Sequence, residues 1–176
     1  MKRMLLLVTL AAVAATMALA GTAYAGQSDA NPGAKKGLAQ VRKATTKYHD
    51  EGKAIAAGYA RTDHCVELPG LGGMGYHYVN EALVGDPSID PLKPEVLLYA
   101  PKKNGERKLV GVEYLAFDAD GDPSTDGDRP ELFGVPFNGP MEGHEPGMPV
   151  HYDLHAWIFK GNPDGVFADF NPKVRC

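Results

Sequence analysis

Polar and apolar residues alternate strictly along residues 150–158. The even positions are apolar, and the odd positions carry the side chains of His151, Asp153, His155 and Trp157. A period of two is typical of a β-strand whose two faces differ. Residues four apart lie about 13 Å from each other in a strand, so His151 and His155 would be too distant to bind one ion. A helix would place both histidines on one face, and this alternative stays open.

A second period covers residues 34–60, where apolar side chains recur every three to four positions. The stripe consists of Leu38, Val41, Thr45, Tyr48, Ile55 and Tyr59, and lysines and arginines fill the remaining faces. This spacing is typical of one face of a helix. No proline interrupts the segment, and its alanines favour helix. We therefore predict one long helix here.

Shorter apolar runs predict further strands at residues 76–79, 95–99 and 108–117. The last two are joined by Asn104-Gly105, a common hairpin turn. Residues 68–75 are glycine-rich and predict a loop, and residues 86–94 and 131–149 are rich in proline and glycine. The pattern predicts an α+β fold, with one long N-terminal helix packed on a mainly antiparallel β-sheet and long Pro/Gly-rich loops.

The N-terminus has the organisation of a signal peptide. Lys2 and Arg3 precede an apolar run at residues 4–20, and Ala23-Tyr-Ala25 has the small-x-small pattern of a cleavage site. A membrane anchor is the alternative, but the polar residues that follow position 25 argue against it. We predict a signal peptide at 1–25, a disordered lead at 26–33 and a single globular domain at 34–176. The mature protein would be secreted or periplasmic, with no membrane association after signal cleavage.

The net charge and the glycine-rich loop argue against nucleic acid and nucleotides as binding partners. The net charge of −4 becomes more negative once Lys2 and Arg3 are removed, which is not the balance of a nucleic-acid-binding protein. The glycine-rich loop lacks the lysine of a phosphate-binding loop, so no nucleotide is expected. The physiological partner is not indicated by the sequence.

The chain has two cysteines, Cys65 and Cys176. An even number in an exported chain indicates one disulfide, with a thiolate metal ligand as the alternative. Closing a loop of this length would stabilise the fold by about 4–5 kcal/mol on the chain-entropy model.

Histidines and carboxylates in the predicted strands suggest a metal site. Glu113 is the only charge within residues 109–117, and His77 lies in an aromatic strand. A buried carboxylate needs a cation or several hydrogen-bond donors. The candidate ligands are His77, Glu113, His151, Asp153 and His155, a set that suits zinc, copper or non-haem iron. The alternative is a polar sheet face wet by solvent with no metal, in which His77 and Glu113 are hydrogen-bonded to each other or to tyrosines.

A separate acidic loop at residues 118–128 places oxygen ligands at alternate positions. The candidates for calcium are Asp118, Asp120, Asp122 and Asp126. The register that begins at Asp122 matches an EF-hand loop only in its first half, because its twelfth position is Phe133 rather than glutamate. A solvated acidic loop is the alternative.

Several segments carry a resemblance to known proteins. Residues 48–59, 75–80, 90–101, 109–114 and 155–176 are similar to a family of small exported bacterial proteins of uncharacterised function. The resemblance implies export and a shared fold, and it implies no activity, cofactor or site residue.

The sequence is compatible with three functional hypotheses. The first is a secreted small binding domain with a His/carboxylate transition-metal site. The second is a small secreted metal-dependent enzyme, a hydrolase or oxidoreductase, that uses the same cluster. The third is a structural or interaction module with no metal. No catalytic triad or nucleophile motif is present, so the enzyme hypothesis rests on the metal site alone.

Overall fold

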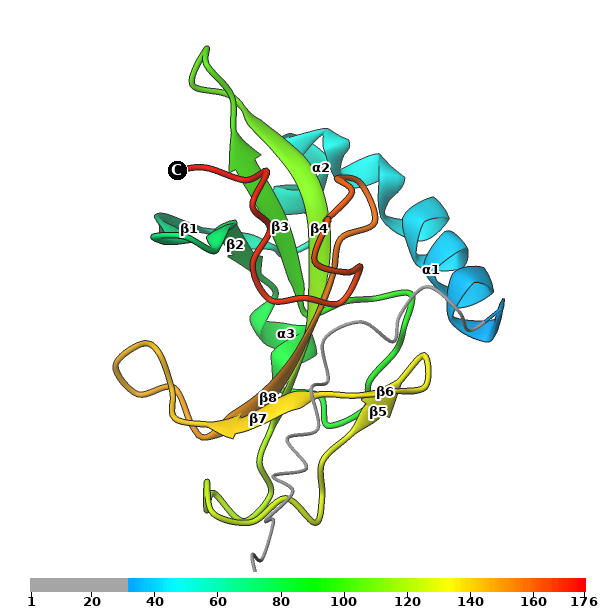
Figure 1. The fold of residues 1–176 in the computed structure, drawn as a ribbon, viewed down its shortest axis with the longest axis vertical. Coiled ribbons are helices and arrows are strands. Elements are labelled where there is room, and N and C mark those ends of the chain that lie inside the picture. Colours follow the sequence, from blue (N-terminus) through cyan, green and yellow to red (C-terminus); the bar gives the residue numbers. More distant parts are fainter. Residues whose placement is uncertain (1–31) are drawn as a thin grey trace, which may run out of the picture.

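The computed structural model describes residues 32–176 (Figure 1). The helices are α1 (Pro32–Thr45), the 3₁₀ helix η1 (Thr46–His49), α2 (Glu51–Ala56) and α3 (Glu81–Val84). The strands are β1 (Ala60–Leu68), β2 (Gly72–Val79), β3 (Val96–Pro101), β4 (Arg107–Phe117), β5 (Glu131–Leu132), β6 (Val135–Pro136), β7 (Asn138–Met141) and β8 (His151–Ala156).

Six of these strands form one curled sheet in the order β1-β2-β3-β4-β8-β7, and every neighbouring pair is antiparallel. The strands predicted at 76–79, 95–99, 108–117 and 150–158 correspond to β2, β3, β4 and β8, with ends shifted by a few residues. The strand interpretation of residues 150–158 is therefore confirmed, and the helical alternative is excluded.

The prediction of an α+β fold built on one long N-terminal helix is wrong. The chain is mainly an antiparallel sheet, and the predicted helix is divided into α1, η1 and α2. The Thr45 hydroxyl donates to the Val41 carbonyl, which competes with regular helical bonding where α1 ends. Asp50 is extended, and its carboxylate caps α2 by accepting from Gly52 N. From Ala60 the chain enters β1, a strand that the sequence pattern did not predict.

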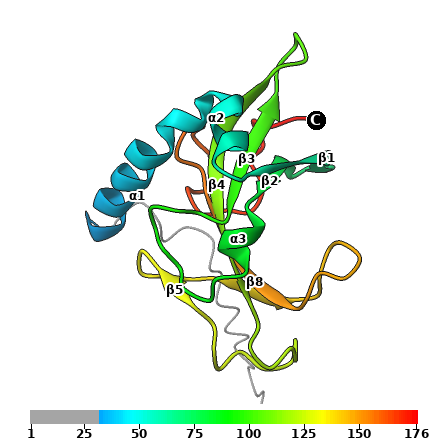
Figure 2. The same cartoon turned by 180° about the vertical axis from the view of Figure 1, so that it is seen from behind.

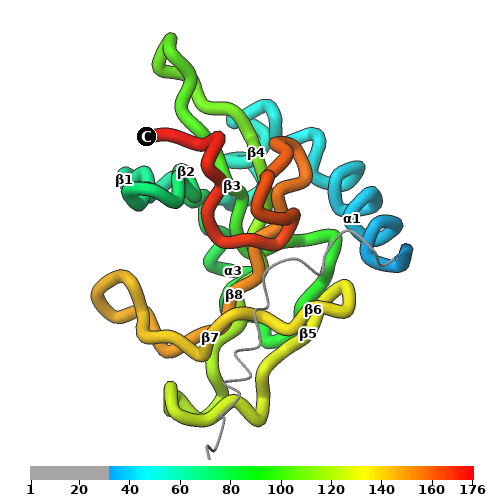
Figure 3. Tube along the Cα trace, viewed as in Figure 1, coloured from blue at the N-terminus to red at the C-terminus, as the bar shows by residue number. Residues whose placement is uncertain are grey.

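The central strands β3, β4 and β8 are buried on both faces of the sheet. Helices α1 and α2 cover one face, as the reverse view shows (Figure 2). The core on this side is rich in tyrosine, with Tyr78, Tyr99, Tyr114 and Tyr152 fully buried. Residues 160–176 cross the opposite face (Figure 3), where Val174 packs against Val96, Leu98 and Trp157. Asp169 of this C-terminal segment lies beside Asp153 and His155 of β8, so the segment helps to remove these two side chains from solvent.

Two glycines let the C-terminal segment lie directly on β2. Gly73 exchanges two backbone hydrogen bonds with Asn171, at 3.1 and 3.2 Å. Gly72 has a φ of 96°, and a side chain there would collide with the backbone of Asn171 and Pro172. The predicted glycine-rich loop is shorter than expected, because β2 begins at Gly72. Gly72 and Gly73 allow the backbone of the C-terminal segment to approach β2 closely.

The disulfide between Cys65 and Cys176 is confirmed, with a Cα–Cα distance of 5.7 Å. It joins β1 to the last residue and fixes the covering segment at its end. A disulfide is consistent with an extracellular or periplasmic location. None of the helices within residues 32–176 is long and apolar enough to span a bilayer. The predicted signal peptide and residues 26–31 of the predicted lead lie outside the described residues, and α1 already begins at Pro32.

Candidate metal centre

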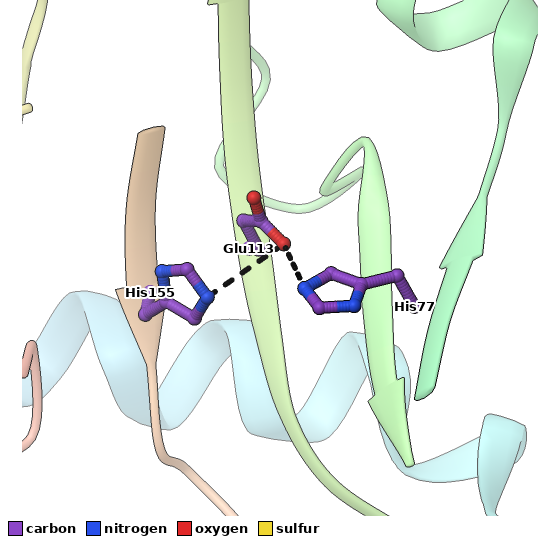
Figure 4. Close-up of side chains that lie close together, drawn as sticks. All are labelled: His77, Glu113 and His155. Atoms are coloured by element: carbon purple, nitrogen blue, oxygen red, sulfur yellow. Dashed lines mark ion pairs between the residues drawn. The ribbon is translucent and has the colours of Figure 1, made fainter. Parts of the chain in front are cut away.

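Three of the predicted ligands meet on the sheet face that the C-terminal segment covers. Glu113 on β4 lies directly opposite His155 on β8, so the two side chains share a face. His77 reaches the same face from β2, across the intervening strand β3. Figure 4 shows the Glu113 carboxylate pointing between the two imidazole rings, with the helices behind the sheet. Antiparallel registry thus brings together residues from three separate parts of the chain.

The distances fit a metal ion bound between the three side chains. Glu113 Oε2 lies 3.3 Å from His77 Nε2 and 3.8 Å from His155 Nε2. Ligand atoms around a tetrahedral zinc ion lie about 3.3–3.6 Å apart, so the first distance falls within this range and the second lies slightly above it. The three ligand atoms all lie within 4.8 Å of one another. The exposed fractions of the side chains are 19% for His77, 7% for Glu113 and 1% for His155. The site is therefore largely buried, and His77 forms its more accessible side.

Several polar atoms in this site have no hydrogen-bond partner. They are Glu113 Oε2 and both ring nitrogens of His155. A buried polar atom without a partner costs about 1–3 kcal/mol, and more when it is charged. The facing unpaired atoms are two kinds of metal ligand, a carboxylate oxygen and an imidazole nitrogen. A bound cation would satisfy them together.

Burial controls the protonation of these groups. Desolvation raises the pKa of Glu113 well above 4.5, and the nearby Asp153 carboxylate adds to the shift. Desolvation lowers the pKa of His77 to about 3 and that of His155 to about 4. The histidines are consequently neutral at pH 7, with a lone pair available to a metal. Ionising Glu113 in this buried site costs free energy, and a bound cation would offset that cost.

A second group adjoins the first on the other side of the His155 ring. It consists of Asp153, His155 and Asp169, whose ligand atoms lie within 4.8 Å of one another. Asn138 Nδ2 donates to Asp169 Oδ1 at 2.5 Å and to Asp153 Oδ1 at 3.4 Å, which holds the two carboxylates together. Burial raises the pKa of both Asp153 and Asp169.

Asp169 was not predicted from the sequence. It lies in the turn-rich C-terminal segment, where no strand or helix period assigns it to a face. Its proximity to Asp153 depends on how this segment folds across the sheet, and Trp157 Nε1 fixes that path by donating to the Ala168 carbonyl at 2.5 Å. The only sequence feature that indicated a fixed position for this segment was Cys176, whose predicted disulfide ties its end to the domain.

His151 is the one predicted transition-metal ligand that lies apart from both groups. It shares the face of Asp153 and His155 but sits further along β8, opposite Phe117. Its Nδ1 lies 3.1 Å from the Pro149 carbonyl, and its ring lies edge-on to that of His144, with centroids 5.0 Å apart. This arrangement agrees with the prediction that His151 and His155, four residues apart in a strand, are too distant to bind one ion.

The four aspartates predicted to bind calcium do not form one of the metal-type groups found within residues 32–176. Asp118, Asp120 and Asp122 each accept backbone N–H groups two or three residues ahead, which stabilises local turns. Asp126 forms an ion pair with Arg129 at 3.1 Å. Calcium binding by this loop stays a prediction.

Comparison of the chain with protein-family models, with curated proteins and with solved structures found no match. The resemblance to small exported bacterial proteins therefore stays a prediction, and the site geometry alone supports a function.

Proposed function

We propose that the protein is an exported domain that binds a transition-metal ion through His77, Glu113 and His155. The observation that carries this proposal is the set of buried, unpaired ligand atoms: Glu113 Oε2 and His155 Nε2 face each other without a hydrogen bond. A solvated polar face would not leave such atoms buried. A hydrogen bond between His77 and Glu113, whose Nε2 and Oε2 lie 3.3 Å apart, would still leave both ring nitrogens of His155 without a partner. A bound cation supplies the compensation that residues 32–176 do not provide.

The donor set favours zinc first, with copper and iron as the other candidates. Two imidazole nitrogens and one carboxylate oxygen are ligands that zinc prefers, whereas calcium and magnesium prefer oxygen alone. Ligand type does not separate zinc from copper, because copper binds the same donors more tightly. Metal identity is therefore a matter for measurement, and zinc is the first ion to test.

A metal-dependent enzyme is the second candidate. Three protein ligands leave one position of a tetrahedral ion unfilled, as is usual in catalytic zinc sites, whereas structural sites have four. The partial exposure of His77 is compatible with access for a small molecule. Metal-dependent hydrolysis of an activated ester, absent in Glu113→Gln, would favour this candidate over simple binding.

The direct test is the metal content of the exported protein, purified without a histidine tag from a periplasmic expression host. We expect stoichiometric zinc, copper or iron, or zinc binding by the metal-free protein with a higher melting temperature. His77→Ala should weaken zinc binding by at least 100-fold. His151→Ala is the matched control, because His151 belongs to the same sheet face but to neither ligand group, and it should bind as the wild type does. Absence of metal together with no thermal shift would exclude the proposal.

A further inference from the structure

The ring of His155 has a second nitrogen that is also buried and unpaired. Nε2 faces Glu113, and Nδ1 lies 3.9 Å from Asp153 Oδ1, which is too long for a hydrogen bond. Asp169 completes a group of three ligand residues with Asp153 and His155, whose ligand atoms lie within 4.8 Å of one another. The two sides of one imidazole thus face two separate sets of carboxylate oxygens.

The charges in this region are also uncompensated. Glu113, Asp153 and Asp169 provide three carboxyl groups in a largely buried volume. None of the ion pairs within residues 32–176 joins any of them to a lysine or arginine. Asn138 donates to two of the carboxylates but brings no positive charge. A single divalent cation beside Glu113 would leave the Asp153 and Asp169 side without a cation of its own.

We propose that a second divalent transition-metal ion binds to Asp153, Asp169 and Nδ1 of His155, so that the imidazole of His155 bridges two ions. This inference rests on the proposed function, because the first ion occupies Nε2 of the same ring. Asn138 positions the two aspartates through its hydrogen bonds, and it leaves carboxylate oxygens free for the ion.

The proton balance of this arrangement is simple. A neutral imidazole carries one proton, and it offers one lone pair to the first ion at Nε2. Binding of the second ion at Nδ1 releases the remaining ring proton to solvent, and the first ion favours that loss by withdrawing electron density. The ring becomes an imidazolate with a negative charge. Burial raises the pKa of Glu113, Asp153 and Asp169, and any proton that these carboxyl groups carry is also released to solvent when the ions bind. Two divalent ions then neutralise three carboxylates and one imidazolate.

The second site would be completed by the C-terminal segment. Asp169 is supplied by residues 160–176, and the Cys65–Cys176 disulfide and the Gly73–Asn171 bridge hold this segment against the sheet. Asp169 is half-buried, so an ion has access from this side. The bridging residue His155 is 1% exposed and lies at the centre of the arrangement.

The test is a calorimetric titration of the metal-free exported protein with zinc. We expect two equivalents for the wild type and for His151→Ala, one for Asp169→Ala, and none for His155→Ala. Asp169→Asn, which removes the charge but keeps the size, should also bind one and guards against misfolding of the alanine variant. Urea unfolding of each metal-free variant checks that it is folded.

A spectroscopic measurement tests the bridge itself. With copper(II), the first equivalent should give an ordinary paramagnetic resonance signal. The second should reduce the signal per copper, because an imidazolate couples the two unpaired spins. In Asp169→Ala this loss should not occur. Two equivalents that persist in both Asp169 variants, or a full-intensity signal at two equivalents, would overturn the bridged site.

The failures of the two proposals are distinguishable. Binding of one zinc by the wild type, with unchanged binding by Asp169→Ala, would overturn the second site and leave the first in place. It would assign Asp153 and Asp169 to orienting the His155 ring. Binding of no zinc by the folded wild type would overturn both proposals.

Discussion

Glu113→Gln should stabilise the metal-free protein and abolish its response to metal. The Glu113 side chain is 7% exposed, and its Oε2 has no hydrogen-bond partner within residues 32–176. Glutamine has nearly the same shape and cannot ionise. Its amide group can also donate to Nε2 of His77 or to an unpaired nitrogen of His155. The substitution therefore removes the electrostatic cost of the site without leaving a cavity.

The magnitude follows from the pKa of Glu113. Burial holds this pKa well above 4.5 in the folded chain, whereas the carboxyl of the unfolded chain titrates near 4.5. An acid with a raised pKa in the folded state favours folding at low pH, and stability is lost as pH rises from 4.5 toward the folded pKa. The loss is about 1.4 kcal/mol per pH unit.

The assay is urea unfolding of both proteins in a chelator at pH 5 and pH 7. His77 and His155 contribute with the opposite sign, because their pKa values are lowered and their contribution is lost as pH falls below about 6.5. Glu113 Oε2 lies 3.3 Å from His77 Nε2 and 3.8 Å from His155 Nε2, so the difference between the two proteins at each pH reports Glu113 together with its interaction with these histidines. We expect Glu113→Gln to be more stable by about 1–3 kcal/mol at pH 7, and by less at pH 5.

Zinc should offset the stability advantage of Glu113→Gln. At a free concentration one hundred times the dissociation constant, binding stabilises the wild type by about 2.7 kcal/mol. For a domain of this size that corresponds to a rise of roughly 5–10 °C in melting temperature. Glu113→Gln should show little of this rise. A metal-free Glu113→Gln that is less stable than the wild type at pH 7, or that gains as much from zinc, would refute the reasoning.

Three further predictions concern the disulfide, the covering segment and the pH dependence of metal binding. Replacement of both Cys65 and Cys176 by alanine should lower the free energy of unfolding by about 4–5 kcal/mol in urea titrations, because the crosslink closes a long loop; an unchanged midpoint would contradict this. Gly72→Ala should cost about 3 kcal/mol or more in the same assay, because a side chain would meet the backbone of the covering segment. Gly70→Ala, with a similar φ but nothing within 4 Å, should cost only about 1–2 kcal/mol, and equal losses would argue against the close approach. Zinc affinity should fall by about tenfold per pH unit below the raised pKa of Glu113, because the ion must displace its proton; calorimetry that finds the same affinity at pH 5 and pH 7 would contradict the assignment.

The candidate site was partly predictable because its residues lie in strands with clear alternation. The period of two placed Asp153 and His155 on one face of β8, and the lone charge within an apolar run marked Glu113. Antiparallel pairing then aligned Glu113 with His155. The same geometry separated His151 from His155, which the spacing of strand residues had indicated.

The remaining features depend on contacts between distant parts of the chain. The helical period continued through residues 45–50, but the Thr45 hydroxyl and the Asp50 cap divide the predicted helix, and periodicity does not detect such local hydrogen bonds. Strand β1 has mostly exposed side chains and therefore no alternation. Asp169 reaches the site only because the C-terminal segment crosses the sheet. A pattern within one segment cannot predict which segment covers its polar face.

The most direct test of the metal site is anomalous diffraction at the zinc edge from crystals grown with zinc. The account predicts a peak about 2.0–2.2 Å from His77 Nε2, Glu113 Oε2 and His155 Nε2. No peak at this position in zinc-saturated crystals, whether or not zinc is bound at another site, would contradict it.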